Sequence, residues 1–241
     1  MDEAYYLGTY WGARKESASE CAVRAEALLS HLPDVDPSFD RWFQQGKSRK
    51  SALKKPIETS AAQMERWVNR GKDCVVEELG YRLRGWNGVP DDRDASSFDA
   101  TCGGCSARVN NYWLFDLPIQ GAVASRVLTG PVLSKLLRAT AVAWEPDWGV
   151  AMSHAHRNIA EPRRAAKSPY VGWVTYLARH RGPVPPLPAP VRIEQVEDKG
   201  TIIILTPERF TASNPEHVAL AERVRELLDR AGLLKPLQAQ P

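Results

Sequence analysis

The chain has 241 residues, of which 43% are hydrophobic and 25% charged, as in an ordinary soluble globular protein. Its 32 basic and 29 acidic residues leave a net charge of +3, which is too small to indicate nucleic-acid binding by itself. The N-terminus MDEAYYLG has no basic or apolar signal region, no apolar run is long enough to span a bilayer, and four Cys do not form a disulfide framework in a chain of this length. We therefore expect a cytoplasmic protein.

The first third of the chain is predicted to be one strand followed by helices. In residues 5–11 a period of two places Tyr5, Leu7, Thr9 and Trp11 on one side and Tyr6, Gly8 and Tyr10 on the other, which predicts an aromatic strand. Ser17 and Glu20 have the spacing of a capping box, so we predict a helix over residues 17–32 that Pro33 ends. Two shorter helices are predicted over residues 36–46 and from Thr59 or Ser60 to Gly71, with a basic segment, residues 47–55, between them.

The remainder is predicted to be mostly strands. Strands are expected at residues 81–86, 98–102, 107–117, 148–152 and 170–177, with a helix at 130–144. The proline-rich stretch 182–190 is predicted to be an extended connector. The clearest hairpin joins 191–196 to 201–206, and Asn214 caps a final helix that Gly232 ends.

This order predicts an α+β fold with a mostly antiparallel sheet, on which N-terminal helices and a C-terminal helix pack. We expect one domain over residues 1–241, divisible into a helical layer (1–78) and a strand-rich part with helices (79–241).

The pair Cys102 and Cys105 has the only spacing typical of a metal or redox site. A structural zinc site needs four ligands, and the remaining thiols, Cys21 and Cys74, are single and distant. A tight turn between strands, in which glycine supplies a positive φ, explains the pair better. We expect no metal and no cofactor.

A second possible site is the His154–x–His156 pair, which lies near Glu145, Asp147 and Ser153. The sequence contains no GxSxG elbow that would support a catalytic triad, so a surface loop is the favoured interpretation. The other three histidines, His31, His180 and His217, are expected to be solvated. A small Cys/His-dependent enzyme and a nucleic-acid adaptor that uses residues 47–55 remain alternatives, although no aromatic residues are interleaved with that basic run.

Several segments together resemble immunity protein family 52 of bacterial polymorphic toxin systems. They are YWGARKES, DPSFDRWFQQGKSRKSAL, ELGYRLRGWNG, AWEPDWG and the terminal TPERF…NPEHVALAERVRELLDRAGLL, and they cover about residues 5 to 234 in order. The resemblance implies a non-enzymatic cytoplasmic antidote that binds a cognate toxin and protects the producing cell and its kin. The implied toxin has a restriction-endonuclease-like nuclease domain and is delivered by a type VI or related secretion system.

Tight binding usually depends on a few Trp, Tyr or Arg anchors ringed by polar contacts. Two groups have that composition, and their members are our candidate toxin-binding residues: Trp11, Arg14, Lys15 and Glu16, and Trp86, Asn87, Asp91, Asp92 and Asp94. A core role for both Trp residues is an equally good interpretation. The acidic loop 91–94 could occupy the phosphate-binding cleft of a nuclease. Alternatively, the protein could bind beside that cleft and distort or block it, or prevent toxin assembly. We favour this second route because the net charge of the chain is positive.

Overall fold

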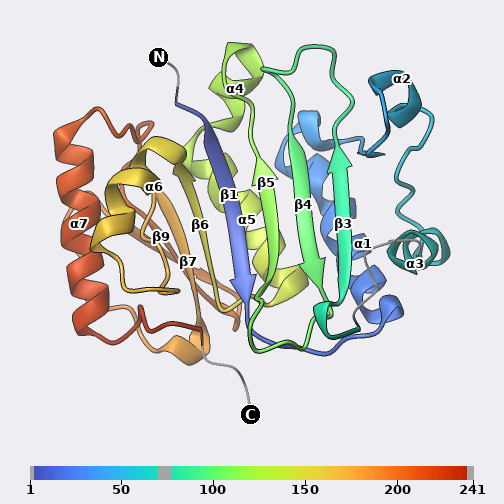
Figure 1. Cartoon of the computed structure of the whole chain (residues 1–241). Helices are drawn as coiled ribbons and strands as arrows, with labels where there is room; N and C mark the ends of the chain where they lie inside the picture. The colour runs from blue at the N-terminus through green and yellow to red at the C-terminus, as the bar shows by residue number, and fades with distance from the viewer. Residues whose placement is uncertain (1–2, 70–76, 238–241) are drawn as a thin grey trace.

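The computed structural model describes residues 3–69 and 77–237, and the strands in this part of the chain form one sheet (Figure 1). The order is β2-β3-β4-β5-β1-β6-β7-β9-β8, and neighbouring strands are antiparallel. The strands are β1 (Tyr5–Trp11), β2 (Phe43–Gln44), β3 (Tyr81–Trp86), β4 (Ser97–Cys102), β5 (Asn111–Asp116), β6 (Trp148–Ser153), β7 (Val174–Ala178), β8 (Arg192–Val196) and β9 (Gly200–Ile204). The predicted α+β class with a mostly antiparallel sheet is confirmed.

Helices interrupt and follow these strands. They are α1 (Ala18–Val35), α2 (Arg49–Ala52), α3 (Ala61–Asn69), α4 (Gly121–Val127), α5 (Gly130–Trp144), α6 (His154–Ala160) and α7 (Pro215–Arg230), with short 3-10 turns at Pro37–Phe39, Glu77–Leu79, Glu161–Arg163 and Arg179–Arg181. None of the helices in the part of the chain that the structure describes is long and apolar enough to cross a membrane.

Helix α1 starts as predicted and ends later than predicted. The Ser17 side chain accepts a hydrogen bond from the Glu20 backbone N–H, and the Glu20 carboxylate accepts one from the Ser17 N–H, which completes the capping box. Pro33 does not end the helix but lies inside its last turn. The helix continues to Val35, and the N–H of its C-cap residue Asp36 donates to the Leu32 carbonyl, so the missing proline N–H costs one bond only.

The helix predicted over residues 36–46 is wrong beyond its first turn. Asp36 accepts a hydrogen bond from the Ser38 N–H and starts only a 3-10 turn. Phe43 then pairs with Trp86 of β3, and the Gln44 N–H donates to the Lys55 carbonyl. Long-range strand pairing therefore overrides the local helix signal. The predicted end of α3 at Gly71 lies outside the described residues.

Helices α1 and α5 cover one face of the sheet and lie behind it in Figure 1, and both contribute buried residues to the hydrophobic core. On the opposite face, α6 lies in front of β6, whereas no described helix lies in front of β3, β4 and β5 (Figure 1). Strand residues therefore divide into those that point to the helices and those that face outward. On the helix side, Trp144 of α5 contacts both Trp11, on which its ring stacks, and Trp113, whose ring is tilted by 34°.

Candidate functional site

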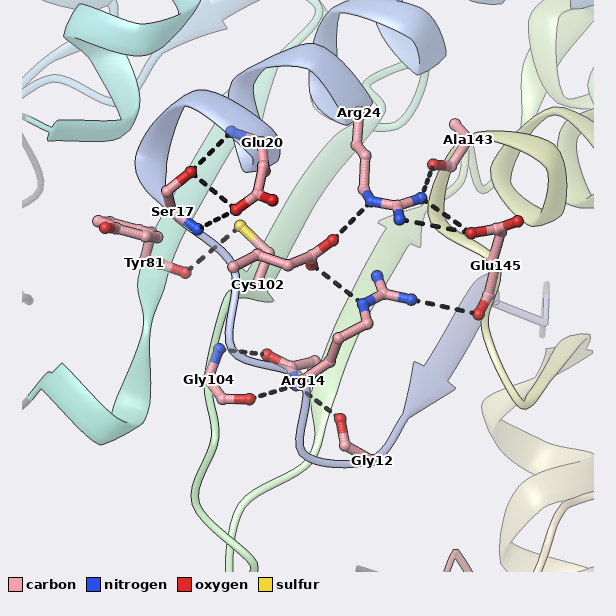
Figure 2. A network of polar contacts seen from close by, with 12 residues as sticks. Gly12, Arg14, Ser17, Glu20, Arg24, Tyr81, Cys102, Gly104, Ala143 and Glu145 are labelled. Atoms are coloured by element: carbon pink, nitrogen blue, oxygen red, sulfur yellow. Dashed lines mark hydrogen bonds and ion pairs between the residues drawn. The ribbon is translucent and has the colours of Figure 1, made fainter. Parts of the chain in front are cut away.

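The first candidate group surrounds a buried carboxylate (Figure 2). Glu16 follows β1 and its side chain is only 7% exposed. Its two oxygens lie 3.1 Å from Arg14 Nε and 2.6 Å from Arg24 Nε. A buried charge is tolerated when it is paired in this way. Glu16 therefore holds the segment after β1 against the first turns of α1.

The same two arginines reach the end of α5 (Figure 2). The Arg24 guanidinium donates to the Ala143 carbonyl at 2.9 Å and lies 3.3 Å from Glu145 Oε2, while Arg14 donates to the Glu145 carbonyl at 3.4 Å. Glu145 caps α5 in the left-handed region, with φ of 48°. A hydrogen bond from Lys199 and the nearby Arg24 charge lower the pKa of Glu145 against the opposing effect of burial. The network thus joins four separate parts of the chain.

The other members of this group differ in exposure. Trp11 is 2% exposed and its ring stacks on Trp144, with ring centroids 5.4 Å apart. The Arg14 guanidinium lies 5.1 Å from the centroid of the Trp11 ring. Trp11 is therefore a core residue and presents no surface to a partner. Lys15 is exposed.

The second candidate group lies at the opposite end of the sheet, because Trp11 pairs with Asn111 at the start of β5 while Trp86 shares a row with Asp116 at its end. Trp86 is partly exposed, and the Arg49 guanidinium of α2 lies 5.5 Å from its ring. The two predicted groups are therefore not brought together.

Asn87 is a buried turn residue. Its side chain accepts a hydrogen bond from the Ser96 N–H at 3.1 Å and donates to the Ser38 carbonyl at 3.3 Å. The acidic residues that follow lie on the loop that these bonds close. Asp91 and Asp92 are exposed and Asp94 is partly exposed. Hydrogen bonds from Arg93 lower the pKa of Asp91 to about 2, so this carboxylate is ionised at neutral pH.

The outward side chains of β3, β4 and β5 form a surface that we call the open face. Its members are Arg82, Arg84, Trp86, Ser97, Asp99, Thr101, Tyr112, Leu114 and Asp116. At its centre Asp99 accepts hydrogen bonds from Arg82, Arg84 and Tyr112, at 2.7, 3.1 and 3.1 Å. Burial raises the pKa of Asp99, but these bonds and the two positive charges outweigh it and lower the pKa. Only Trp86 of this face was among the sequence candidates.

A second surface that the sequence did not indicate is a groove between α1 and α5, with a volume of about 820 Å3. We call it the α1–α5 groove. Its apolar lining consists of Val23, Ala27, Val35, Ala139, Val142 and Ala143. Val23 is 57% exposed and Val142 is 39% exposed. Glu16 and Arg24 of the buried network line the same groove. An exposed apolar strip with a charged rim is typical of an interaction site.

Cys102 and Cys105 lie at the start of the loop between β4 and β5, in which Gly103 has the expected positive φ, but this loop covers residues 103–110 and is longer than the tight turn that we predicted. Gly103 has a φ of 70°, Cys102 is buried at the end of β4, and Cys105 is only partly buried. A hydrogen bond with Cys21 of α1 and burial raise the pKa of Cys102 well above its usual value. Within the described residues, which exclude Cys74, no group of three or more His, Cys, Asp or Glu side chains could hold a metal ion.

The predicted loop at the histidine pair is wrong, because His154 and His156 begin α6. The Ser153 hydroxyl accepts a hydrogen bond from the His156 backbone N–H and so acts as the N-cap of α6. His156 is 3% exposed and its ring lies 4.6 Å from Phe210, and burial lowers its pKa to about 4.

The nearby acidic residues and His217 have other partners. Asp147 accepts the Gly12 N–H at 3.0 Å and lies 2.9 Å from His180. His217 was expected to be solvated but is buried against Phe210, with a ring separation of 5.1 Å, and accepts the Thr211 N–H. The residues considered for a triad therefore serve local packing and capping.

The fold and these surfaces define an α+β protein that exposes apolar, aromatic and charged groups in the combination typical of protein interfaces. The chain belongs to the Immunity protein 52 family, which matches residues 3–237. It is also similar in fold to the Pseudomonas aeruginosa T6SS protein PA0821, with a TM-score of 0.56 and 14% sequence identity over 94% of this chain and 75% of that one. A comparison with curated proteins finds no match.

Proposed function

We propose that this chain is an immunity protein that binds and neutralises a cognate toxin by forming a direct complex. The observation that carries the proposal is the family match, which extends over nearly the whole chain. Such a protein needs binding surfaces and no reaction of its own. The α1–α5 groove and the open face are surfaces of this kind, and both are composed of side chains on regular elements, which hold their geometry.

The finer part of the proposal concerns the toxin. We propose that it is a nuclease, with a restriction-endonuclease-like domain, and that the antidote meets it in the cytoplasm. The sequence resemblance supports this assignment. The structural neighbour is described as a T6SS protein, and this supports delivery of the toxin by a type VI or related secretion system.

The exposure of each candidate residue reduces the set of proposed toxin contacts. Lys15, Trp86, Asp91, Asp92 and Asp94 have exposed or partly exposed side chains and stay proposed toxin contacts. The remaining candidates are proposed to act indirectly, because Trp11 packs in the core, Asn87 closes the loop, and Arg14 and Glu16 hold the start of α1.

The test is co-purification with the toxin encoded by the neighbouring gene, followed by a nuclease assay on plasmid DNA. The expected result is a stable complex in which DNA cleavage by the toxin is suppressed at equimolar antidote. A chain that neither binds this toxin nor suppresses its toxicity in cells would refute the proposed function. A complex with a toxin that does not cleave nucleic acid would refute the nuclease assignment alone.

One observation favours a second candidate function, a nucleic-acid adaptor. Aromatic rings that are distant in sequence lie beside the basic segment, since Arg49 stacks over Trp86, and Lys54, Lys55 and Trp67 line one pocket. Stacking rings next to positive charge are typical of single-strand binding. Retention of the pure chain on immobilised single-stranded DNA at low salt tests this alternative, and absence of retention excludes it.

A further inference from the structure

The α1–α5 groove is apolar where the fold does not require it. Helix α1 packs on the sheet through Cys21, Ala25, Leu28 and Leu32, which are fully buried. Val23 lies on the opposite side of the helix and is 57% exposed, so it contributes little to the core. A solvated helix face normally carries polar residues at such positions. The fold itself does not account for an exposed valine at this position, which suits a contact with a binding partner.

Helix α5 supplies the second side of the same strip. It buries Leu133, Leu136 and Leu137 against the sheet, while Val142 remains 39% exposed and Ala139 lines the groove. Val23 and Ala27 on α1 are one helical turn apart, as are Ala139 and Val142 on α5. Each helix thus presents a row of small and medium apolar side chains, and the groove lies between the two rows.

The two walls of the groove carry different net charges. The α1 side is lined by three acidic residues, Glu16, Glu20 and Asp34, and one basic residue, Arg24, whereas Lys135 and Arg138 line the α5 side. Hydrogen bonds from Ser17 lower the pKa of Glu20, so that wall is negative at neutral pH. Arg138 is held by Glu194 and by the Gln195 carbonyl, so it lies at a fixed position on the rim. Glu16 and Arg24 line the groove, and the ion pairs of Arg24 with Glu16 and Glu145 tie α1 to the end of α5.

We propose that the α1–α5 groove receives one amphipathic helix of the cognate toxin, and this inference rests on the proposed function. The apolar stripe of that helix contacts Val23, Ala27 and Val142. Its basic side chains face Glu20 and Asp34, and an acidic side chain faces Lys135. Glu20 and Asp34 are 14 positions apart, which corresponds to about 21 Å along α1 and to roughly four turns of a partner helix.

Shape and charge select this occupant. Helix-in-groove recognition needs a hydrophobic channel whose walls fix the register by charge, and both are present here. A second copy of this chain would present the same hollow strip, and two concave strips leave a void between them. A single-stranded nucleic acid would be repelled by Glu20 and Asp34 on the α1 side of the groove.

The experiment compares two matched double variants in a calorimetric titration with the toxin encoded by the neighbouring gene. Val23→Asp/Val142→Asp alters the groove, and Val109→Asp/Ile193→Asp alters apolar residues of similar exposure, 45% and 42%, elsewhere on the surface. All four side chains are exposed, so both variants should fold, and circular dichroism and thermal melting check this. We expect the groove variant to bind at least about a hundredfold more weakly than the control.

Two further arms test the nature of the occupant. Asp34→Lys and Lys135→Glu, made separately, should each weaken the complex at least about threefold at low salt, and less at high salt. Hydrogen exchange of the toxin in the complex should show protection of one segment with apolar residues at helical spacing. Protection of an extended strand or an irregular loop in its place would overturn the assignment of a helix.

The outcomes separate the two proposals. If the wild-type chain does not bind the toxin, the proposed function fails. If the wild-type chain binds the toxin and the groove variant binds equally well, the proposed function stands and the groove inference is overturned. Loss of binding by a Tyr112→Ala variant would then place the contact on the open face. If light scattering shows that the wild-type chain is a dimer which the groove variant converts to a monomer, the groove is a self-interface and the inference is again overturned.

Discussion

Replacing Glu16 with Gln should reveal how much of the stability depends on the buried network. The substitution keeps the shape of the side chain and removes the negative charge between Arg14 and Arg24. Breaking a fully buried ion pair by removing one partner costs about 3–5 kcal/mol. The Glu16 side chain is 7% exposed, but each arginine side chain is 26% exposed and keeps part of its hydration. We therefore expect Glu16→Gln to lower the free energy of unfolding by about 2–3 kcal/mol.

The assay is urea unfolding at pH 7 followed by circular dichroism, with thermal melting as a second readout. For a chain of this size, a loss of about 2–3 kcal/mol corresponds to a decrease of roughly 4–12 °C in Tm. Glu58→Gln is the matched control, because Glu58 is an exposed acid, and its effect should lie within about 0.5 kcal/mol of zero.

A double-mutant cycle identifies the pair that carries the effect. Arg24→Met keeps the length of the aliphatic side chain and removes the donor to Glu16 and to the Ala143 carbonyl. The double variant Glu16→Gln/Arg24→Met should lose less stability than the sum of the single variants, by about 1 kcal/mol or more. A Glu16→Gln variant as stable as the wild-type chain, or strictly additive single effects, would refute the structural role that we assign to this carboxylate.

Three other predictions concern the core and one buried ion pair. The pKa of His156 is near 6.5 in the unfolded chain and about 4 in the folded one, so the unfolded state binds more protons between these pH values. The free energy of unfolding therefore decreases as the pH falls through this window, by up to about 3 kcal/mol. His156→Phe should remove this part of the pH dependence, and an unchanged slope of stability against pH would contradict the prediction. The Asp36 side chain is 3% exposed and accepts two hydrogen bonds from Arg126, at 2.6 and 2.9 Å. Asp36→Asn should therefore lower the free energy of unfolding, measured in urea, by about 2 kcal/mol. A decrease below about 0.5 kcal/mol would mean that the pair is dispensable for stability. Trp144→Ala should cost at least about 3 kcal/mol because it removes a fully buried ring from the stack, and a fully folded variant with unchanged Tm would show that this stack is not part of the core.

Much of the fold was accessible from local sequence patterns. Helix α5 has the predicted bounds, β3 has the predicted bounds, and the β8–β9 hairpin and the Asn214 cap of α7 are confirmed. In each case the periodicity and the terminal residues favour the same structure. The errors occur where a local signal opposes a distant contact, as at Phe43, which pairs with β3 and does not continue a helix.

The candidate surfaces were much less accessible. The α1–α5 groove depends on the packing of two helices that are about a hundred residues apart in the chain, and neither helix alone indicates a hollow. The same is true of Asp99, whose partners Arg82 and Arg84 reach it only through the register of β3 with β4. The one signal that could have indicated the groove is Val23, an apolar residue on the polar side of an otherwise amphipathic helix.

The first candidate group shows why composition alone could not separate contact residues from core residues. Trp11, Arg14 and Glu16 have the aromatic and charged character of an interface hot spot, and the same character suits a strand end that must be fixed to a helix. The direction of Trp11 decides between these roles, and it is set by the pairing of β1 with β5 and β6, which places Trp11 on the helix side against Trp144. Because the Trp11 ring is buried, Arg14 and Glu16 lie at the edge of the core, where Glu16 pairs with Arg14 and Arg24. In the proposed complex, their role is to hold α1 at the spacing from α5 that keeps the groove open, and Val23 and Val142 are the residues to test for direct contact.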